Sequence, residues 1–163
     1  MLARGFTLLE TLIVVSIMTI VFGIGFGVLV SAQKTARSQE ASAGLIHVLA
    51  VAHERAMLGN EASSWGVYLD YNDISRNISE YVLFGGDSYA TRNVALDKIY
   101  TVDSVALITD ASLSGASPSS GDDHEVVFSL FSGETSQYGT VTLDSIGVVK
   151  TLEISKYGWA VWE

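Results

Sequence analysis

The stretch that decides the fold is MLARGFTLLETLIVV, residues 1–15, because it places an acid at the front of a long apolar run. No charged residue follows Glu10 until Lys34, so residues 11–33 form an uncharged segment of 23 residues. As a helix this segment would be about 35 Å long at about 1.5 Å per residue, which is enough to cross a bilayer. A carboxylate close to a bilayer is costly, and such residues are usually functional and paired. We therefore expect Glu10 to have a cationic partner.

Three ordinary interpretations of the first 33 residues compete. A secretory signal peptide has a shorter apolar core followed by a small-residue cleavage site. A plain single-span anchor fits the length but gives Glu10 no use. A buried helix of a soluble protein rarely contains so long an uncharged run. On physical grounds alone the plain anchor is favoured, and its short leader favours an N-terminus that stays in the cytoplasm.

The junction between Gly5 and Phe6 offers a source for the missing cation. Gly leaves the backbone unhindered, and a cut after it would place a free amine four residues before Glu10. Within one helix the two groups are poorly placed to neutralise each other. Between neighbouring, axially staggered helices the two groups could pair well.

The segment GFTLLETLIVV resembles the class III signal of type IV pilins and type II secretion pseudopilins. The resemblance implies that residues 1–5 are a leader that a membrane-bound prepilin peptidase removes by cutting between Gly5 and Phe6. It also implies N-methylation of Phe6 and an assembly role for Glu10, the fifth mature residue. The implied partners are the peptidase, other pilin or pseudopilin subunits, the inner-membrane assembly machinery and membrane lipid. The implied location is a single pass through the cytoplasmic (inner) membrane with an extracytoplasmic head, and then the filament.

The apolar segment departs from many major pilins because it has no Pro at its middle. It carries instead the glycines of GIGFG, which are Gly23, Gly25 and Gly27. Each costs a helix about 1 kcal/mol relative to Ala. They would let the segment stretch or unwind inside a filament, or they would allow close packing between helices. Both interpretations remain open.

From Lys34 onward the pattern becomes polar and periodic. Apolar residues recur at three- and four-residue steps and form one face of a helix. The residues of this face are Ala41, Leu45, Val48, Leu49, Ala52 and Ala56. Gly59 followed by Asn60 is a typical helix stop. We therefore predict one helix over residues 6–58, divided into a membrane and filament-core part (6–33) and an amphipathic part of the head (34–59).

The remainder, residues 60–163, is predicted to be a β-rich head. The candidate strands are WGVYLDY (65–71), YVLFGG (81–86), KIYTVDSVALIT (98–109), EVVFSLFSG (125–133), GTVTLDSI (139–146), VVKTLEISK (148–156) and WAVW (159–162). Residues 111–123 are predicted to be a flexible polar loop, and residues 87–97 are the one segment with room for a further helix. The sheet should be antiparallel, which gives an α+β, pilin-like fold. The head resembles H-type minor pseudopilins and FimT-like minor pilins in its helix end AVAHERAMLGN, its strands GVYLDY and GTVTL, its strand-turn VVFSLFSGE and its closing hairpin ISKYGWAVW.

No catalytic constellation stands out, so we expect a structural protein rather than an enzyme, with no cofactor. The chain has no cysteine, and no P-loop, GxSxG or HExxH motif is present. His47 and His53 are six residues apart, which does not suit a metal pair on a helix. Asp122, Asp123 and Glu125 crowd beside His124, and a solvated acidic loop is favoured there over a calcium site.

The charge balance argues against nucleic acid as a partner. Asp and Glu number 18 against 9 Lys and Arg, and a polyanion is repelled by such a surface. DNA binding would require convergence of the basic residues of the head, which are Arg76, Arg92, Lys98, Lys150 and Lys156. The preferred function is thus a cleaved, methylated filament subunit of a pilus or pseudopilus. The rivals are a filament-tip binding module for DNA or a surface, and an anchored extracytoplasmic domain that is never cleaved.

Overall fold

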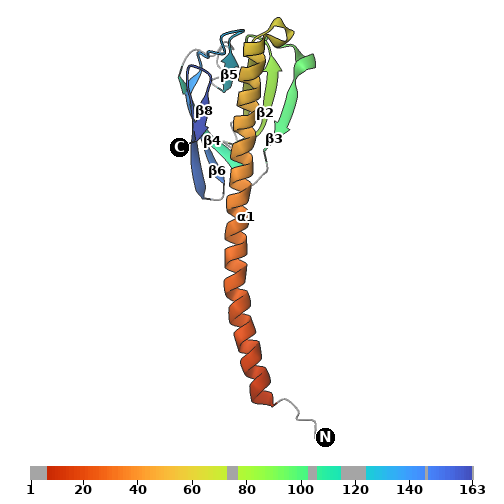
Figure 1. Cartoon of the computed structure of the whole chain (residues 1–163), viewed down its shortest axis with the longest axis vertical. Coiled ribbons are helices and arrows are strands. Elements are labelled where there is room, and N and C mark those ends of the chain that lie inside the picture. The colour runs from red at the N-terminus through yellow and green to blue at the C-terminus, as the bar shows by residue number, and fades with distance from the viewer. Residues whose placement is uncertain (1–6, 73–76, 103–105, 115–123, 146, 163) are drawn as a thin grey trace. The chain divides into compact units, whose positions relative to one another are not determined.

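The computed structural model describes residues 7–72, 77–102, 106–114, 124–145 and 147–162, and within them it leaves undescribed the side chains of residues 24–28, 71–72, 77–79, 106–107, 110 and 145. The chain forms two compact units, Met1–Ala36 and Arg37–Glu163. The helix α1, Leu8–Leu58, contributes to both units (Figure 1). This single long helix agrees with the predicted range of 6–58 over the described residues.

The C-terminal end of α1 lies where the Gly59–Asn60 signal predicts it. Gly59 adopts a left-handed conformation with φ 66°, and its amide donates to the carbonyl of Ala56 at 3.2 Å. A short 3₁₀ turn, Asn60–Ala62, follows it. Glycine is favoured at this position because a side chain there would meet the steric penalty of the left-handed region.

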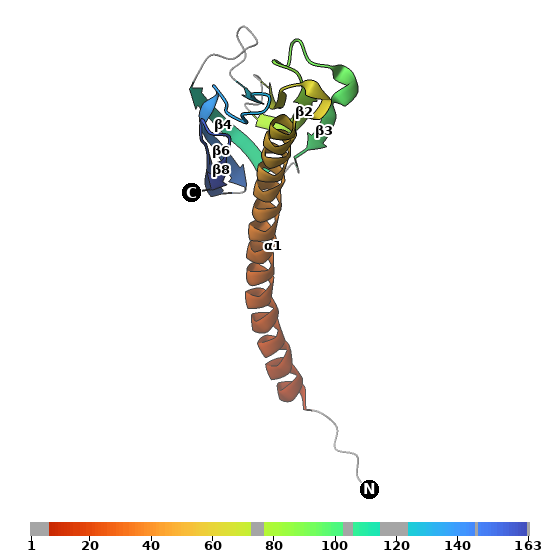
Figure 2. The same cartoon turned by 45° about the horizontal axis from the view of Figure 1, so that its top comes forward.

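The described residues of the head form eight strands, which are joined in one antiparallel sheet. The strands are β1 Trp65–Asn72, β2 Asn77–Gly85, β3 Lys98–Thr101, β4 Ala106–Ser114, β5 Glu125–Phe128, β6 Tyr138–Ser145, β7 Val148–Ile154 and β8 Ala160–Trp162. Their order is β5-β1-β2-β4-β6-β7-β8, with β3 paired to β2. Figures 1 and 2 show β2 and β3 on one side of the head portion of α1, and β4, β6 and β8 on the other. The sheet therefore curls around this part of the helix.

Several predicted segments of the head have bounds that differ from those of the structure. The predicted strand 98–109 is two strands, because β3 pairs with residues 80–83 of β2 whereas β4 pairs with Ile78 and then with β6. Residues 111–114 of the predicted polar loop belong to β4, and residues 115–123 lie outside the described part. The predicted strand 125–133 ends at Phe128, and the segment 87–97 contains only the 3₁₀ turn η2, Val94–Leu96.

The core lies between the amphipathic part of α1 and the sheet. Leu45, Val48 and Leu49 are almost fully buried, and Ala52 and Ala56 are completely so. They meet the alternate, inward-facing residues of the strands. These residues are Trp65, Val67, Leu69, Tyr81, Leu83, Ile108, Val126, Phe128, Val141, Leu143, Leu152 and Ile154. Each large side chain buried in this way contributes about 1.5–3 kcal/mol, so the head has a core of its own.

Candidate functional site

The start of α1 is organised by Thr7 and Glu10. The main-chain amide of Glu10 donates to the Thr7 hydroxyl at 3.3 Å and to the Thr7 carbonyl at 3.1 Å. Since α1 begins at Leu8, Thr7 is the N-cap and Glu10 is the third helical residue. This is the T-x-x-E pattern of a capping box, and an acid in the first turn also interacts favourably with the helix dipole. Sequence reasoning missed Thr7, although GFTLLE contains the pattern.

The hydroxyl groups that follow Glu10 are satisfied within the helix. The side chains of Thr11, Ser16 and Thr19 donate to the carbonyls of Leu8, Leu12 and Val15, at 2.9, 2.8 and 2.8 Å. Such back-bonding satisfies a hydroxyl where no water is at hand. The carboxylate of Glu10 is the one ionisable group between residues 8 and 22, so it is the one polar side chain there that bonding within the helix does not satisfy.

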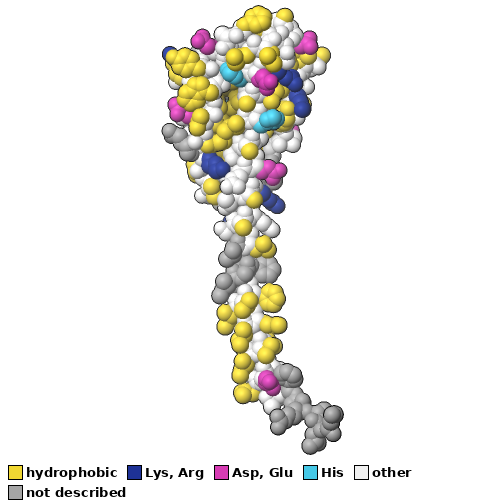
Figure 3. All heavy atoms as spheres, viewed as in Figure 1, with side chains coloured by type: hydrophobic (Ala, Val, Ile, Leu, Met, Phe, Trp, Pro, Cys, Tyr) yellow, Lys and Arg dark blue, Asp and Glu magenta, His cyan; other side chains and the backbone are white. Residues whose placement is uncertain are grey.

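The apolar side chains of this segment are exposed on all sides of the helix. Every large hydrophobic residue described between Leu8 and Val30 is at least 45% exposed, and Figure 3 shows hydrophobic side chains gathered along the helix on the N-terminal side of the grey mid-helix atoms. Among the described residues, no helix combines the length and hydropathy that a membrane crossing requires. An uncovered apolar surface of this extent indicates a segment that meets lipid or other protein.

The other residues of this segment with a predicted role are Gly5, Phe6, Gly23, Gly25 and Gly27. Gly5 and Phe6 lie outside the described residues. The backbone at Gly23, Gly25 and Gly27 is helical without interruption. A Cβ on Gly23 would have no neighbour within 4 Å, so no contact within the chain requires a glycine there.

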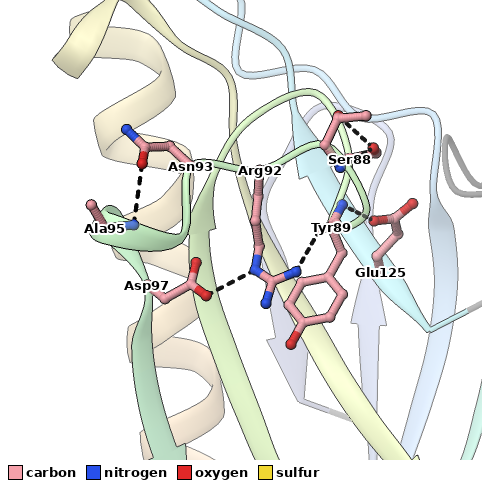
Figure 4. Close-up of polar contacts among 8 residues, drawn as sticks. Ser88, Tyr89, Arg92, Asn93, Ala95, Asp97 and Glu125 are labelled. Carbon is pink, nitrogen blue, oxygen red and sulfur yellow. Dashed lines mark hydrogen bonds and ion pairs between the residues drawn. The ribbon is translucent and has the colours of Figure 1, made fainter.

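The predicted acidic loop is corrected at Glu125. Asp122 and Asp123 lie outside the described residues, but Glu125 is fully buried in β5 rather than solvated. Its Oε2 accepts from the amide of Tyr89 at 2.7 Å (Figure 4). The carboxylate therefore anchors the β2–β3 connection onto the face of the sheet opposite α1. Sequence pattern could not reveal this, because the two residues are 36 positions apart.

The same connection holds Arg92 in a structural role. Its Nε donates to Asp97 at 2.8 Å, its Nη1 donates to the carbonyl of Tyr89 at 2.7 Å, and its guanidinium lies over the Tyr89 ring at 3.6 Å. Lys98 lies on β3 and Lys150 on β7, with β4 and β6 between β2 and β7 in the sheet. Arg76 lies outside the described residues. Lys156 follows the end of β7. The described basic residues of the head therefore lie in two parts of the sheet separated by β4 and β6, which does not favour a DNA surface.

Among the histidines and tryptophans singled out in the sequence, His53 and Trp162 have packing contacts. The ring of His53 contacts Phe128 edge-on, with centroids 5.5 Å apart. Trp162 is half-buried and donates from Nε1 to the carbonyl of Ser42 at 3.3 Å, whereas Trp159 is 53% exposed. Within the described ranges, no three His, Asp or Glu side chains gather as a metal site would require.

Comparison with protein families identifies the N-terminal segment. Residues 1–26 match the prokaryotic N-terminal methylation motif, the class III signal of prepilins. This signal implies processing by prepilin peptidase. The long helix on an antiparallel sheet is the pilin-like architecture predicted from the sequence. Comparison with curated proteins and with solved structures gave no significant match.

Proposed function

We propose that the chain is a structural subunit of a type IV pilus or a type II secretion pseudopilus. In this proposal prepilin peptidase cuts between Gly5 and Phe6 and methylates the new amine of Phe6. The inner-membrane assembly machinery then moves the subunit from the cytoplasmic membrane into a filament. The single observation that carries the proposal is that the methylation motif, residues 1–26, coincides with an exposed apolar helix whose one carboxylate is Glu10.

The proposal assigns a role to each part of the chain. Residues 1–5 are the leader, and residues 6–33 are held first by lipid and then by neighbouring helices of the filament core. Residues 34–59 are the amphipathic part of the helix that belongs to the head, and residues 60–163 form the rest of the head. The internally bonded hydroxyls of Thr11, Ser16 and Thr19 support this division, since they let the segment pass between lipid and protein without an unsatisfied donor.

Glu10 is proposed to receive the Phe6 amine of a neighbouring subunit. A lone buried charge in the filament core would cost several kcal/mol, and a pair offsets much of that cost. The pairing would also fix the axial register of the helices. Gly23, Gly25 and Gly27 are proposed to provide the flexibility, or the close packing, that the helix needs there.

For the head, we propose a likeness to H-type minor pseudopilins and FimT-like minor pilins, whichever share of the filament this subunit forms. This rests on the resemblance of the helix end AVAHERAMLGN and of the closing hairpin ISKYGWAVW. A filament-tip module that binds DNA is the weaker candidate, because the guanidinium of Arg92 already forms an ion pair with Asp97 and a hydrogen bond to the carbonyl of Tyr89. A tip module that binds another surface would still be a cleaved subunit of the same filament.

The test is the intact mass of the membrane-extracted protein from a host with an active prepilin peptidase. We expect loss of residues 1–5 and gain of one methyl group. Gly5→Val is the matched control, because a branched residue at the junction should leave the chain at full length. A dominant full-length parent would favour the uncleaved anchored domain and overturn the proposal.

A further inference from the structure

Phe131 is an exposed aromatic residue held in a strained backbone conformation. Its side chain is 69% exposed, and its φ of 64° lies in the left-handed region that bulky residues avoid. Its amide donates to the carbonyl of Ala56 at 2.9 Å, which ties it to the last turn of α1. Strain of this kind persists at functional sites, where the surrounding structure enforces it.

The turn that carries Phe131 is fixed on all sides. The amide of Ser129 donates to the carbonyl of Glu134 at 2.8 Å, and the amide of Gly133 donates back to the carbonyl of Ser129 at 2.9 Å. Gly133 packs against His53 and Met57 so closely that a Cβ would not fit. The ring of Phe131 is therefore presented rigidly, with little conformational entropy to lose on binding.

Two further exposed side chains, Met57 and Leu58, belong to the same end of α1. We call Phe131, Met57 and Leu58 the knob. Phe131 lies against Gly59, the residue that follows Leu58. Figure 3 shows hydrophobic side chains gathered at this end of the head. The knob is a small projection, whereas a segment that binds a membrane surface presents a broad apolar face.

A pocket of about 250 Å³ lies at the other end of the head portion of α1. It is lined by Arg37, Glu40, Ala41, Gly44, Tyr81, Thr101 and Val102, which we call the hole. Gly44 keeps it open, since a Cβ there would lie 3.1 Å from the Tyr81 Oη. Its volume suits one aromatic side chain, and both Arg37 and Tyr81 make favourable contacts with an aromatic ring.

We propose that Phe131 of one copy of this chain occupies the hole of a second copy. The inference rests on the proposed function, because a filament of repeated subunits needs a contact between two different surfaces of the same chain. Such a heterologous contact does not close on itself and generates an open helical assembly. The turn 129–134 carries Glu134 and no cation, and Arg37 is the cation in the lining of the hole that would face it, whereas Glu40 in the same lining would oppose it. Insertion of Phe131 into the hole would offset the mutual repulsion of subunits that each carry a net charge of −9.

The first test uses the absence of cysteine in the chain. Ser132→Cys beside the knob and Thr101→Cys at the rim of the hole are placed in one full-length chain, and sheared filaments are treated with a short bismaleimide. A heterologous contact predicts a ladder of dimers, trimers and longer multimers. Each single variant should give no cross-linked species, and Ser132→Cys with the exposed Thr140→Cys on β6 is the matched control pair. Absence of a ladder, or a dimer from either single variant, would overturn the inference.

The second test separates assembly from folding. Asn tolerates the left-handed conformation, so Phe131→Asn should unfold at the same temperature as the parent or higher. It should nevertheless abolish the ladder and reduce incorporation into filaments at least tenfold. Tyr157→Asn, at another exposed aromatic residue, should leave both unchanged. A second variant, Thr101→Trp, should block the hole from the other side of the contact. Normal incorporation of Phe131→Asn would contradict the inference.

These outcomes are distinct from failure of the proposed function. If the parent chain is absent from sheared filaments, the filament role itself is wrong. If the parent is present and the double-cysteine chain forms no ladder, the filament role stands and the contact between knob and hole is wrong.

Discussion

The rings of Tyr68 and Tyr89 lie parallel, with centroids 3.8 Å apart and an interplanar angle of 7°. Arg92 lies over the Tyr89 ring as well, so both faces of that ring are covered. Beneath it, the carboxylate of Glu125 binds the Tyr89 amide. One residue thus fastens the β2–β3 connection to the face of the sheet opposite α1.

Removing this ring should destabilise the head. We expect Tyr89→Ala to lower the free energy of unfolding by about 2–3 kcal/mol, because it removes a half-buried aromatic ring together with its contacts with Tyr68, Phe84 and Arg92. Urea denaturation of the head fragment described next measures this. Tyr157→Ala is the control, since that exposed ring should contribute less than about 0.5 kcal/mol. Equal stability of the two variants would show that the stack does not hold the connection.

The head should fold without the N-terminal unit. A fragment that starts at Lys34 retains every core residue of α1, so it should be soluble and its circular dichroism should show both helix and strand. A fragment that starts at Asn60 lacks Leu45, Val48 and Leu49 and should aggregate, because the inner face of the sheet would be uncovered. An unfolded Lys34 fragment would refute the two-part architecture.

The stability of the head should fall at alkaline pH through Tyr81. Burial first, and the neighbouring Tyr100 second, raise the pKa of Tyr81 above its ordinary value of 10.0. Above pH 10 the unfolded chain therefore loses this proton while the folded chain keeps it, and the free energy of unfolding decreases as pH rises. Below pH 10 the contribution is fully present. Denaturation at pH 8 and at pH 11 should show a smaller pH dependence for Tyr81→Phe than for the parent, and an unchanged dependence would contradict the assignment.

Local patterns predicted the elements whose boundaries are set by neighbouring residues. The end of α1 follows from Gly59, and the β7–β8 hairpin follows from Gly158, which has φ 88°. The apolar face from Leu45 to Ala56 follows from its period alone. In each case the physical cause lies within a few residues of the effect.

Features that depend on distant residues could not be predicted in this way. The division of residues 98–109 into β3 and β4 reflects where β2 offers pairing partners, and the burial of Glu125 reflects the path of residues 86–93. The knob and the hole are likewise formed by residues far apart in sequence. Thr7 is different, because its capping contact with Glu10 spans only three residues and is visible in the local pattern T-x-x-E.

The measurement that tests the account most directly compares Glu10→Gln with the parent in sheared filaments. Gln still suits the third position of a capping box, so membrane insertion, cleavage after Gly5 and the helix start should be retained. It has no charge to pair with the Phe6 amine, so incorporation should fall about tenfold or more, as expected for the loss of a buried ion pair. Glu54→Gln, at an exposed acid later in α1, should assemble normally. If Glu10→Gln is cleaved and enters filaments as well as the parent does, Glu10 serves only to cap the helix and the docking account is wrong.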